Sequence, residues 1–95
     1  MADIRIVRQH ALPLVEARRR VLEMLGRLEQ DGVSGQRFPG RWTGDRYLFD
    51  PPTTGSVTID QWTIDVRLHL PLFFGFLKKE VEKKMIVELE RAVTL

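Results

Sequence analysis

The sequence predicts a small α+β domain in which two helices pack on one face of an antiparallel sheet. Two observations support this prediction. The middle of the chain holds several short segments with strand-like alternation, and apolar residues recur at helical spacing on both sides of them. Helices gathered on one face of an antiparallel sheet form a stable layer arrangement. With 95 residues, the chain is expected to form one domain over residues 1–95.

The first part of the chain predicts a short strand followed by a helix. Ile4 and Ile6 alternate with charged residues, which is typical of a strand. Pro13 suits the first turn of a helix because its missing N–H would be unpaired there in any case. Apolar residues then recur at helical spacing, so we expect a helix from Pro13 to about Gln30 that ends near Gly32.

The middle of the chain predicts an antiparallel meander of three to four strands. The last of these gives the clearest signal, because apolar and polar residues alternate along it without an error. The segment 33–41 is a predicted loop, in which Phe38 is expected to tuck under the sheet. The predicted strands are Arg41–Trp42, Arg46–Phe49, Ser56–Asp60 and Trp62–Leu70.

The last part of the chain predicts a helix with a very apolar start. Apolar residues from Leu77 onward recur at helical spacing, and we place the helix from Leu72 or Phe74 to Val93. Three of the 5 Phe residues fall within Pro71–Leu77. On an α-helix these large side chains would point in nearly all directions, so one side of the run must face away from the sheet.

This apolar run is the strongest candidate for an interaction surface. A Phe side chain left exposed forfeits roughly 1.5–3 kcal/mol compared with a buried one. We therefore expect part of the run to be covered by a second copy of the chain, as in a homo-oligomer such as a dimer, or by a lipid-like or polymer surface. The predicted contact residues are Phe73, Phe74, Phe76 and Leu77, and the predicted basic border is Lys78 and Lys79.

The sequence shows no pattern typical of catalysis, of a cofactor site or of a metal site. Cys is absent, and the 2 His residues lack the spacing of a ligand pair. The serines lack the setting of a nucleophile elbow, and the aspartates are explained by turns or by the polar face of the sheet. We expect no catalytic residues, cofactor or metal, and no enzymatic activity. His10 and His69 are expected in capping or surface roles.

The charge pattern does not favour a nucleic-acid partner. The net charge is only +2, and residues 18–20 are three consecutive arginines. Glu16 lies four residues before Arg20, and Glu23 lies four before Arg27, as in ion pairs on a solvated helix face. A weak nucleic-acid-binding regulator that uses Arg18, Arg19, Arg20 and Lys78 is kept as an alternative.

A second alternative is a small-ligand module for hydroxyacyl compounds. A curved meander closed by the last helix could hold an acyl chain between Trp62, Val66 and Val81. Trp42 and Trp62 are nevertheless expected to anchor the small sheet, because aromatic residues dominate burial in small cores.

The sequence predicts a cytoplasmic protein. It contains no apolar stretch long enough for a transmembrane segment and no signal peptide. The absence of Cys fits a reducing compartment.

A series of short motifs runs in order along nearly the whole chain. They are Ile4-x-Ile6 with His10, Ala17-Arg18, Trp42-x-Gly44-Asp45, Gly55-Ser56-Val57, the long alternating strand, the Phe-Gly-Phe-Leu run and a Lys/Glu-rich last helix. With these motifs the chain resembles the polyhydroxyalkanoic acid system family, small proteins found beside polyhydroxyalkanoate granule genes in bacteria. The stretch Gly32–Gly40 and the Pro51-Pro52 turn depart from the family pattern.

The resemblance implies a role at polyhydroxyalkanoate granules. No catalytic residues are assigned for the family, so none are carried over to this chain. Such granules offer an apolar surface inside the cytoplasm, which the Phe-rich run could contact. The sequence therefore predicts a non-enzymatic, granule-associated or interaction protein whose partner is the polymer surface or a granule protein.

Overall fold

The computed structural model describes residues 2–33 and 35–94 and shows the predicted α+β architecture. A strand and a helix are followed by four more strands, a short 3-10 helix and a second α-helix. The elements are β1 (Ala2–Gln9), α1 (Leu14–Asp31), β2 (Gly40–Thr43), β3 (Arg46–Phe49), β4 (Thr54–Ile59), β5 (Thr63–Leu70), the 3-10 helix η1 (Leu72–Leu77) and α2 (Lys78–Val93).

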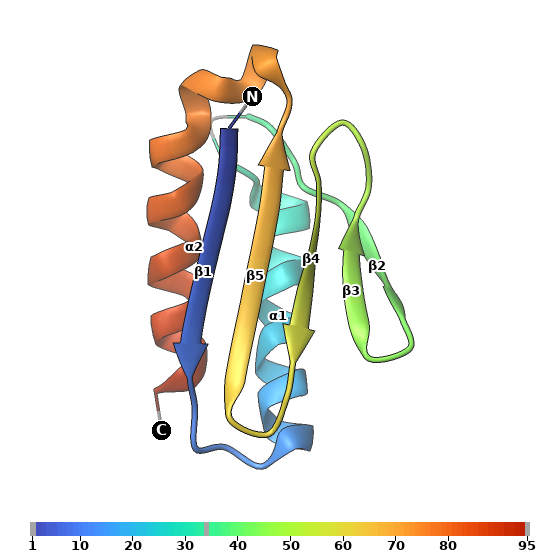
Figure 1. Cartoon of the computed structure of the whole chain (residues 1–95), viewed down its shortest axis with the longest axis vertical. Helices are drawn as coiled ribbons and strands as arrows, with labels where there is room; N and C mark the ends of the chain where they lie inside the picture. The colour runs from blue at the N-terminus through green and yellow to red at the C-terminus, as the bar shows by residue number, and fades with distance from the viewer. Residues whose placement is uncertain (1, 34, 95) are drawn as a thin grey trace.

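The strands form one antiparallel sheet in the order β1-β5-β4-β3-β2. β1 pairs with β5 from Ala2 opposite Leu70 to Gln9 opposite Thr63. This pairing extends the first strand well beyond the predicted Ile4–Ile6. Both helices lie on one face of the sheet, as predicted, and leave the other face open (Figure 1).

The core lies between the sheet and the two helices. Every second residue of β5 from Ile64 to Leu70 is buried, as the alternation predicts. Phe38, from the loop before β2, is also buried as expected. The helices contribute Ala17, Val21, Met24, Leu25 and Leu28 from α1 and Val81, Met85, Leu89 and Ala92 from α2.

The elements from α1 to β5 match the predicted bounds to within two residues.

α1 is followed by Gly32, whose φ of 65° is left-handed and whose N–H donates to the carbonyl of Leu28 at 3.0 Å. A Cβ at this position would lie only 2.1 Å from the carbonyl oxygen of Gln36. The glycine predicted to end the helix is therefore required both by its backbone angle and by the close approach of the chain.

An ion pair with one buried partner links the two helices. Glu88 of α2 is 3% exposed, and its Oε2 accepts hydrogen bonds from Nε and Nη2 of Arg27 in α1 at 2.9 and 2.7 Å. The predicted pairing of Arg27 with Glu23 is wrong, because Glu23 pairs with Arg19. The helical spacing within α1 could not reveal a partner that lies on another helix.

The start of the last helix differs from the prediction. The segment Leu72–Leu77 forms a 3-10 helix, and the α-helix begins only at Lys78. The N–H of Phe74 donates to the carbonyl of Pro71 at 2.8 Å, the three-residue bond of a 3-10 turn. Such turns are frequent at helix N-termini, and Gly75 lowers the α-helical propensity of this segment.

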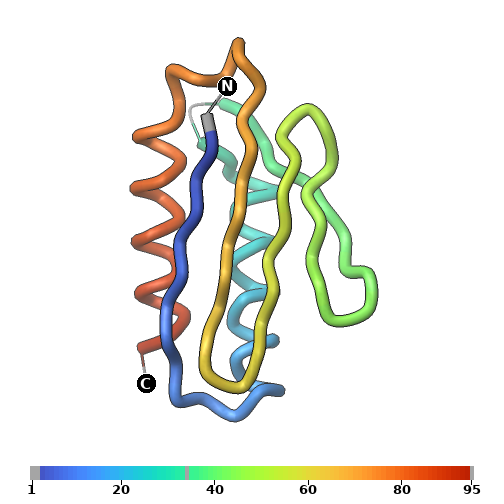
Figure 2. The backbone as a smooth tube through the Cα atoms, in the orientation of Figure 1, coloured from blue at the N-terminus to red at the C-terminus, as the bar shows by residue number. Residues whose placement is uncertain are grey.

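The molecule is elongated along its strands and has two distinct ends. Its extents are 38 × 24 × 22 Å. η1 lies at one end, whereas the β1–α1 connection and the β4–β5 turn lie at the other (Figure 2).

Candidate functional site

Three large apolar side chains project from η1 into solvent. Leu72, Phe73 and Phe76 are 77%, 64% and 79% exposed. We call these three side chains the apolar platform. The described part of the chain therefore leaves three large side chains of the predicted apolar run uncovered.

The 3-10 repeat separates the apolar run into an outer and an inner row. Residues three apart lie above one another in a 3-10 helix, so Phe73 aligns with Phe76, and Phe74 with Leu77. The inner row reaches the core, because Leu77 is 2% exposed and Phe74 packs against buried residues. Leu77 therefore does not belong to an exposed surface, which corrects the prediction. Leu72, which was not a predicted contact residue, joins that surface instead.

The predicted basic border lies directly after the apolar platform. Lys78 and Lys79 are the first two residues of α2, and both are exposed. A cation at a helix N-terminus opposes the helix dipole and typically costs about 0.3–1 kcal/mol. Leu77 at the N-cap position adds no side-chain hydrogen bond. These lysines therefore do not stabilise the helix start.

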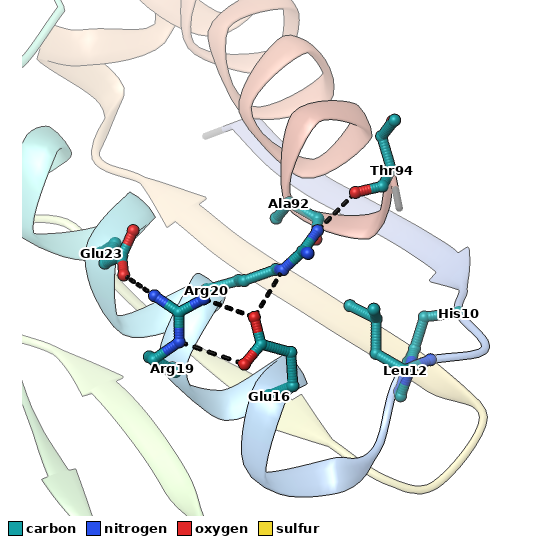
Figure 3. Close-up of polar contacts among 8 residues, drawn as sticks. All are labelled: His10, Leu12, Glu16, Arg19, Arg20, Glu23, Ala92 and Thr94. Atoms are coloured by element: carbon teal, nitrogen blue, oxygen red, sulfur yellow. Dashed lines mark hydrogen bonds and ion pairs between the residues drawn. The ribbon is translucent and has the colours of Figure 1, made fainter.

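Two arginines of the predicted basic run are engaged in an internal network. Arg19 pairs with Glu16 and Glu23, whereas Arg20 pairs with Glu16 at 3.0 Å and with the carbonyl of Ala92 at 3.2 Å (Figure 3). Hydrogen bonds from Arg19 and then Arg20 lower the pKa of Glu16 to about 2. The carboxylate that organises this network is therefore charged at neutral pH. These contacts give no support to the nucleic-acid alternative.

The two tryptophans have different surroundings. Trp42 of β2 is half-buried and meets Tyr47 edge to face, with 5.6 Å between ring centroids. The guanidinium of Arg18 lies 5.6 Å from the Trp42 ring centroid. Trp42 thus anchors the sheet as predicted, but Trp62, in the turn after β4, is 64% exposed and does not.

The predicted acyl-chain site is not assembled. Val66 and Val81 are packed inside the core at 0% and 1% exposure. Trp62 instead lies exposed in the β4–β5 turn, at the end of the molecule opposite η1. The three side chains therefore do not line a common site.

Both histidines contact other parts of the fold. His10 is 7% exposed, and its Nδ1 accepts the N–H of Leu12 at 3.2 Å. Its Nε2 therefore carries the proton and donates to the carbonyl oxygen of Asp60 at 2.8 Å. His10 thus caps the β1–α1 connection, whereas His69 pairs with Asp3 across β1 and β5. Within residues 2–33 and 35–94, no three acidic or histidine side chains are placed to hold a metal ion.

The open face of the sheet carries a compact charged cluster. Oδ2 of Asp65 in β5 accepts hydrogen bonds from Arg5 and Arg67, each at 3.3 Å. Partial burial raises the pKa of Asp65, but these two guanidinium groups outweigh it and lower the pKa below the usual value. Asp65 therefore lies in an ion-pair network on the predicted polar face through Oδ2, whereas its buried Oδ1 has no hydrogen-bond partner.

No helix in the described part of the chain is both long and apolar enough to cross a membrane.

Comparisons with known proteins agree with the fold and with the sequence motifs. The family model described as "Putative polyhydroxyalkanoic acid system protein" matches residues 4–93, so the chain belongs to this family. A crystal structure of TTHA0849 from Thermus thermophilus matches with a TM-score of 0.52 over 97% of this chain and 94% of that chain. At 18% sequence identity this likeness concerns the fold alone. None of the curated proteins matches the chain.

Proposed function

We propose that this member of the polyhydroxyalkanoic acid system family docks on the surface of polyhydroxyalkanoate granules through its apolar platform. The observation that supports the proposal is the exposure of Leu72, Phe73 and Phe76, each between 64% and 79%. The family suggests the matching surface, because a polyhydroxyalkanoate is a polyester with aliphatic chains. Burial of the platform against such a polymer would remove apolar area from water.

The fold orders the apolar platform before any docking takes place. Pro71 precedes η1, and the buried Leu77 and the half-buried Phe74 fasten the same segment to the core. A surface that is ordered before it binds loses less conformational entropy on binding. The platform therefore needs no rearrangement to meet a flat apolar surface.

The expected strength of docking is modest. Burial of one Leu or Phe side chain contributes roughly 1.5–3 kcal/mol, and the platform has three such residues. Association itself costs about 4–15 kcal/mol in lost freedom. We therefore expect reversible docking, with Lys78 and Lys79 facing carboxylate chain ends at the polymer surface.

The test is co-sedimentation with amorphous polyhydroxybutyrate particles. The double variant Phe73→Ser with Phe76→Ser should bind at least about a hundredfold more weakly, because it loses two apolar contacts. The matched control is Val15→Ser with Leu22→Ser, which removes apolar side chains that are 81% and 52% exposed on α1. This control should bind like the wild type.

Salt distinguishes apolar docking from simple charge attraction. Binding through the platform should persist at about 1 M NaCl, where attraction between exposed charges is screened. The proposal is wrong if the double Ser variant, shown to be folded by circular dichroism, binds particles as well as the wild type does.

A further inference from the structure

A second apolar surface lies at the end of the molecule opposite the apolar platform. It is a hollow of about 480 Å³ between the β1–α1 connection and the β4–β5 turn. We call it the end hollow. Its rim includes Leu14 and Trp62, which are 42% and 64% exposed. The lining residues are Ala11, Leu12, Pro13, Leu14, Gln61 and Trp62.

Hydrogen bonds fix both walls of the end hollow. The buried His10 links the two segments through the carbonyl of Asp60 and the N–H of Leu12, and its own backbone N–H donates to the carbonyl of Trp62 at 2.8 Å. The carboxylate of Asp60 accepts the backbone N–H groups of Trp62 and Thr63 at 2.8 and 2.7 Å. The hollow is therefore formed before any partner arrives.

The two ends complement each other in shape and charge. The apolar platform projects, whereas the end hollow recedes. The platform is followed by the positive charges of Lys78 and Lys79, ahead of Glu80. The turn at the end hollow carries the exposed Asp60, which precedes the lining residues Gln61 and Trp62. We propose that the platform of one copy docks into the end hollow of a second copy, with these lysines beside Asp60. This inference goes beyond granule docking because it adds a second surface to the same platform.

A platform-to-platform dimer fits the charges less well. Two platforms face to face would bring Lys78 and Lys79 of both copies together, and like charges across an interface oppose association. A contact between two different surfaces does not close on itself and leads to an open row of copies. The homo-oligomer expected from the sequence then grows head to tail.

The expected association is weak. The platform and the end hollow lie on the small ends of a molecule with extents of 38 × 24 × 22 Å. An interface there falls into the small class, below about 1,200 Å² in total, which is typical of transient contacts. We therefore expect association at protein concentrations of roughly 0.1–1 mM.

A mixing experiment tests the proposal. Sedimentation velocity of the wild type should show species larger than a dimer as concentration rises. Phe76→Ser removes the platform, Trp62→Ser removes the rim of the hollow, and each variant alone should associate at least about tenfold more weakly. An equimolar mixture should recover a dimer and nothing larger, because it supplies one intact platform and one intact hollow per pair.

Several outcomes would overturn the proposal. A wild type that stays monomeric at about 1 mM would do so, and so would a Trp62→Ser variant that associates like the wild type, as a platform-to-platform dimer predicts. Leu22→Ser, on the outer face of α1, is the control that should associate normally. All variants must first show the wild-type circular dichroism spectrum.

The two proposals fail separately. Trp62→Ser leaves the platform intact, so it should still sediment with polyhydroxybutyrate particles even though it no longer self-associates. Loss of self-association with retained particle binding leaves granule docking unaffected. Self-association without particle binding would remove the granule proposal and keep this one.

Discussion

The two apolar ends of the molecule are built in opposite ways. The apolar platform belongs to η1, a run of 6 consecutive residues above the core. The end hollow joins two segments that lie 50 positions apart where His10 meets Asp60. A surface made by one segment is visible as a pattern in the sequence, whereas a surface made by two segments exists only after the strands have paired. Three sets of substitutions test this contrast.

The largest effect should come from the two rows of η1. Leu77→Ala removes a side chain that is 2% exposed, so it should lower the free energy of unfolding by about 2–5 kcal/mol. Phe76→Ala, at 79% exposure, should change that free energy by less than about 0.5 kcal/mol. Urea denaturation followed by circular dichroism measures both. Equal losses would show that η1 does not separate an inner from an outer row.

A smaller effect should distinguish the end hollow from the platform. His10→Ala removes two hydrogen bonds and leaves the N–H of Leu12 without its acceptor. Each buried polar group left unpaired costs about 1–3 kcal/mol, so we expect the free energy of unfolding to fall by about 2–4 kcal/mol. Self-association should disappear while particle docking persists. His69→Ala, the matched control on the open face of the sheet, should cost less than about 1 kcal/mol. Loss of particle docking in His10→Ala would mean that the two ends are not independent.

The smallest effect concerns the pKa of Asp60, which lies in the β4–β5 turn. Hydrogen bonds from the backbone of Trp62 and Thr63 lower the pKa of Asp60 below its ordinary value of 3.8. The stability that Asp60 contributes is therefore complete above pH 3.8 and is lost as pH falls through the lowered pKa. Thermal melts should show a constant difference between wild type and Asp60→Asn at neutral pH, which vanishes in acid. Particle docking should not follow this titration, because Asp60 lies in the β4–β5 turn, at the end of the molecule opposite η1. A difference in melting temperature between wild type and Asp60→Asn that grows in acid would contradict the lowered pKa of Asp60.

Local patterns were sufficient to predict most of the fold. The alternation in β5 marked its buried face, the bounds of β3 matched the predicted Arg46–Phe49, and Gly32 ended α1 as expected. Each of these features depends on neighbouring residues and on the direction in which side chains leave a strand or helix. The exposure of Phe73 and Phe76 followed from the same reasoning.

Features that depend on distant contacts could not be predicted in this way. Arg27 pairs with Glu88 because α2 packs beside α1, and no spacing within α1 contains that information. Trp62 is 64% exposed, and its turn is linked to the β1–α1 connection by His10, a contact across 50 positions that no local pattern contains. The choice of a 3-10 helix over an α-helix rests on a difference of one residue in hydrogen bonding. The apolar pattern of so short a run, interrupted by Gly75, does not distinguish a 3-10 helix from an α-helix.

The position of β1 in the sheet determines how the chain must acquire its structure. Among the described strands β1 pairs only with β5, whose residues follow more than fifty positions later. Closing so long a loop costs entropy before any pairing is gained, whereas the hairpins from β2 to β5 close short loops. The meander should therefore form first, and β1 should join it in a slower step. During that interval Ile4 and Ile6 have no sheet to cover them, so the aggregation of newly made chains should depend on the first strand.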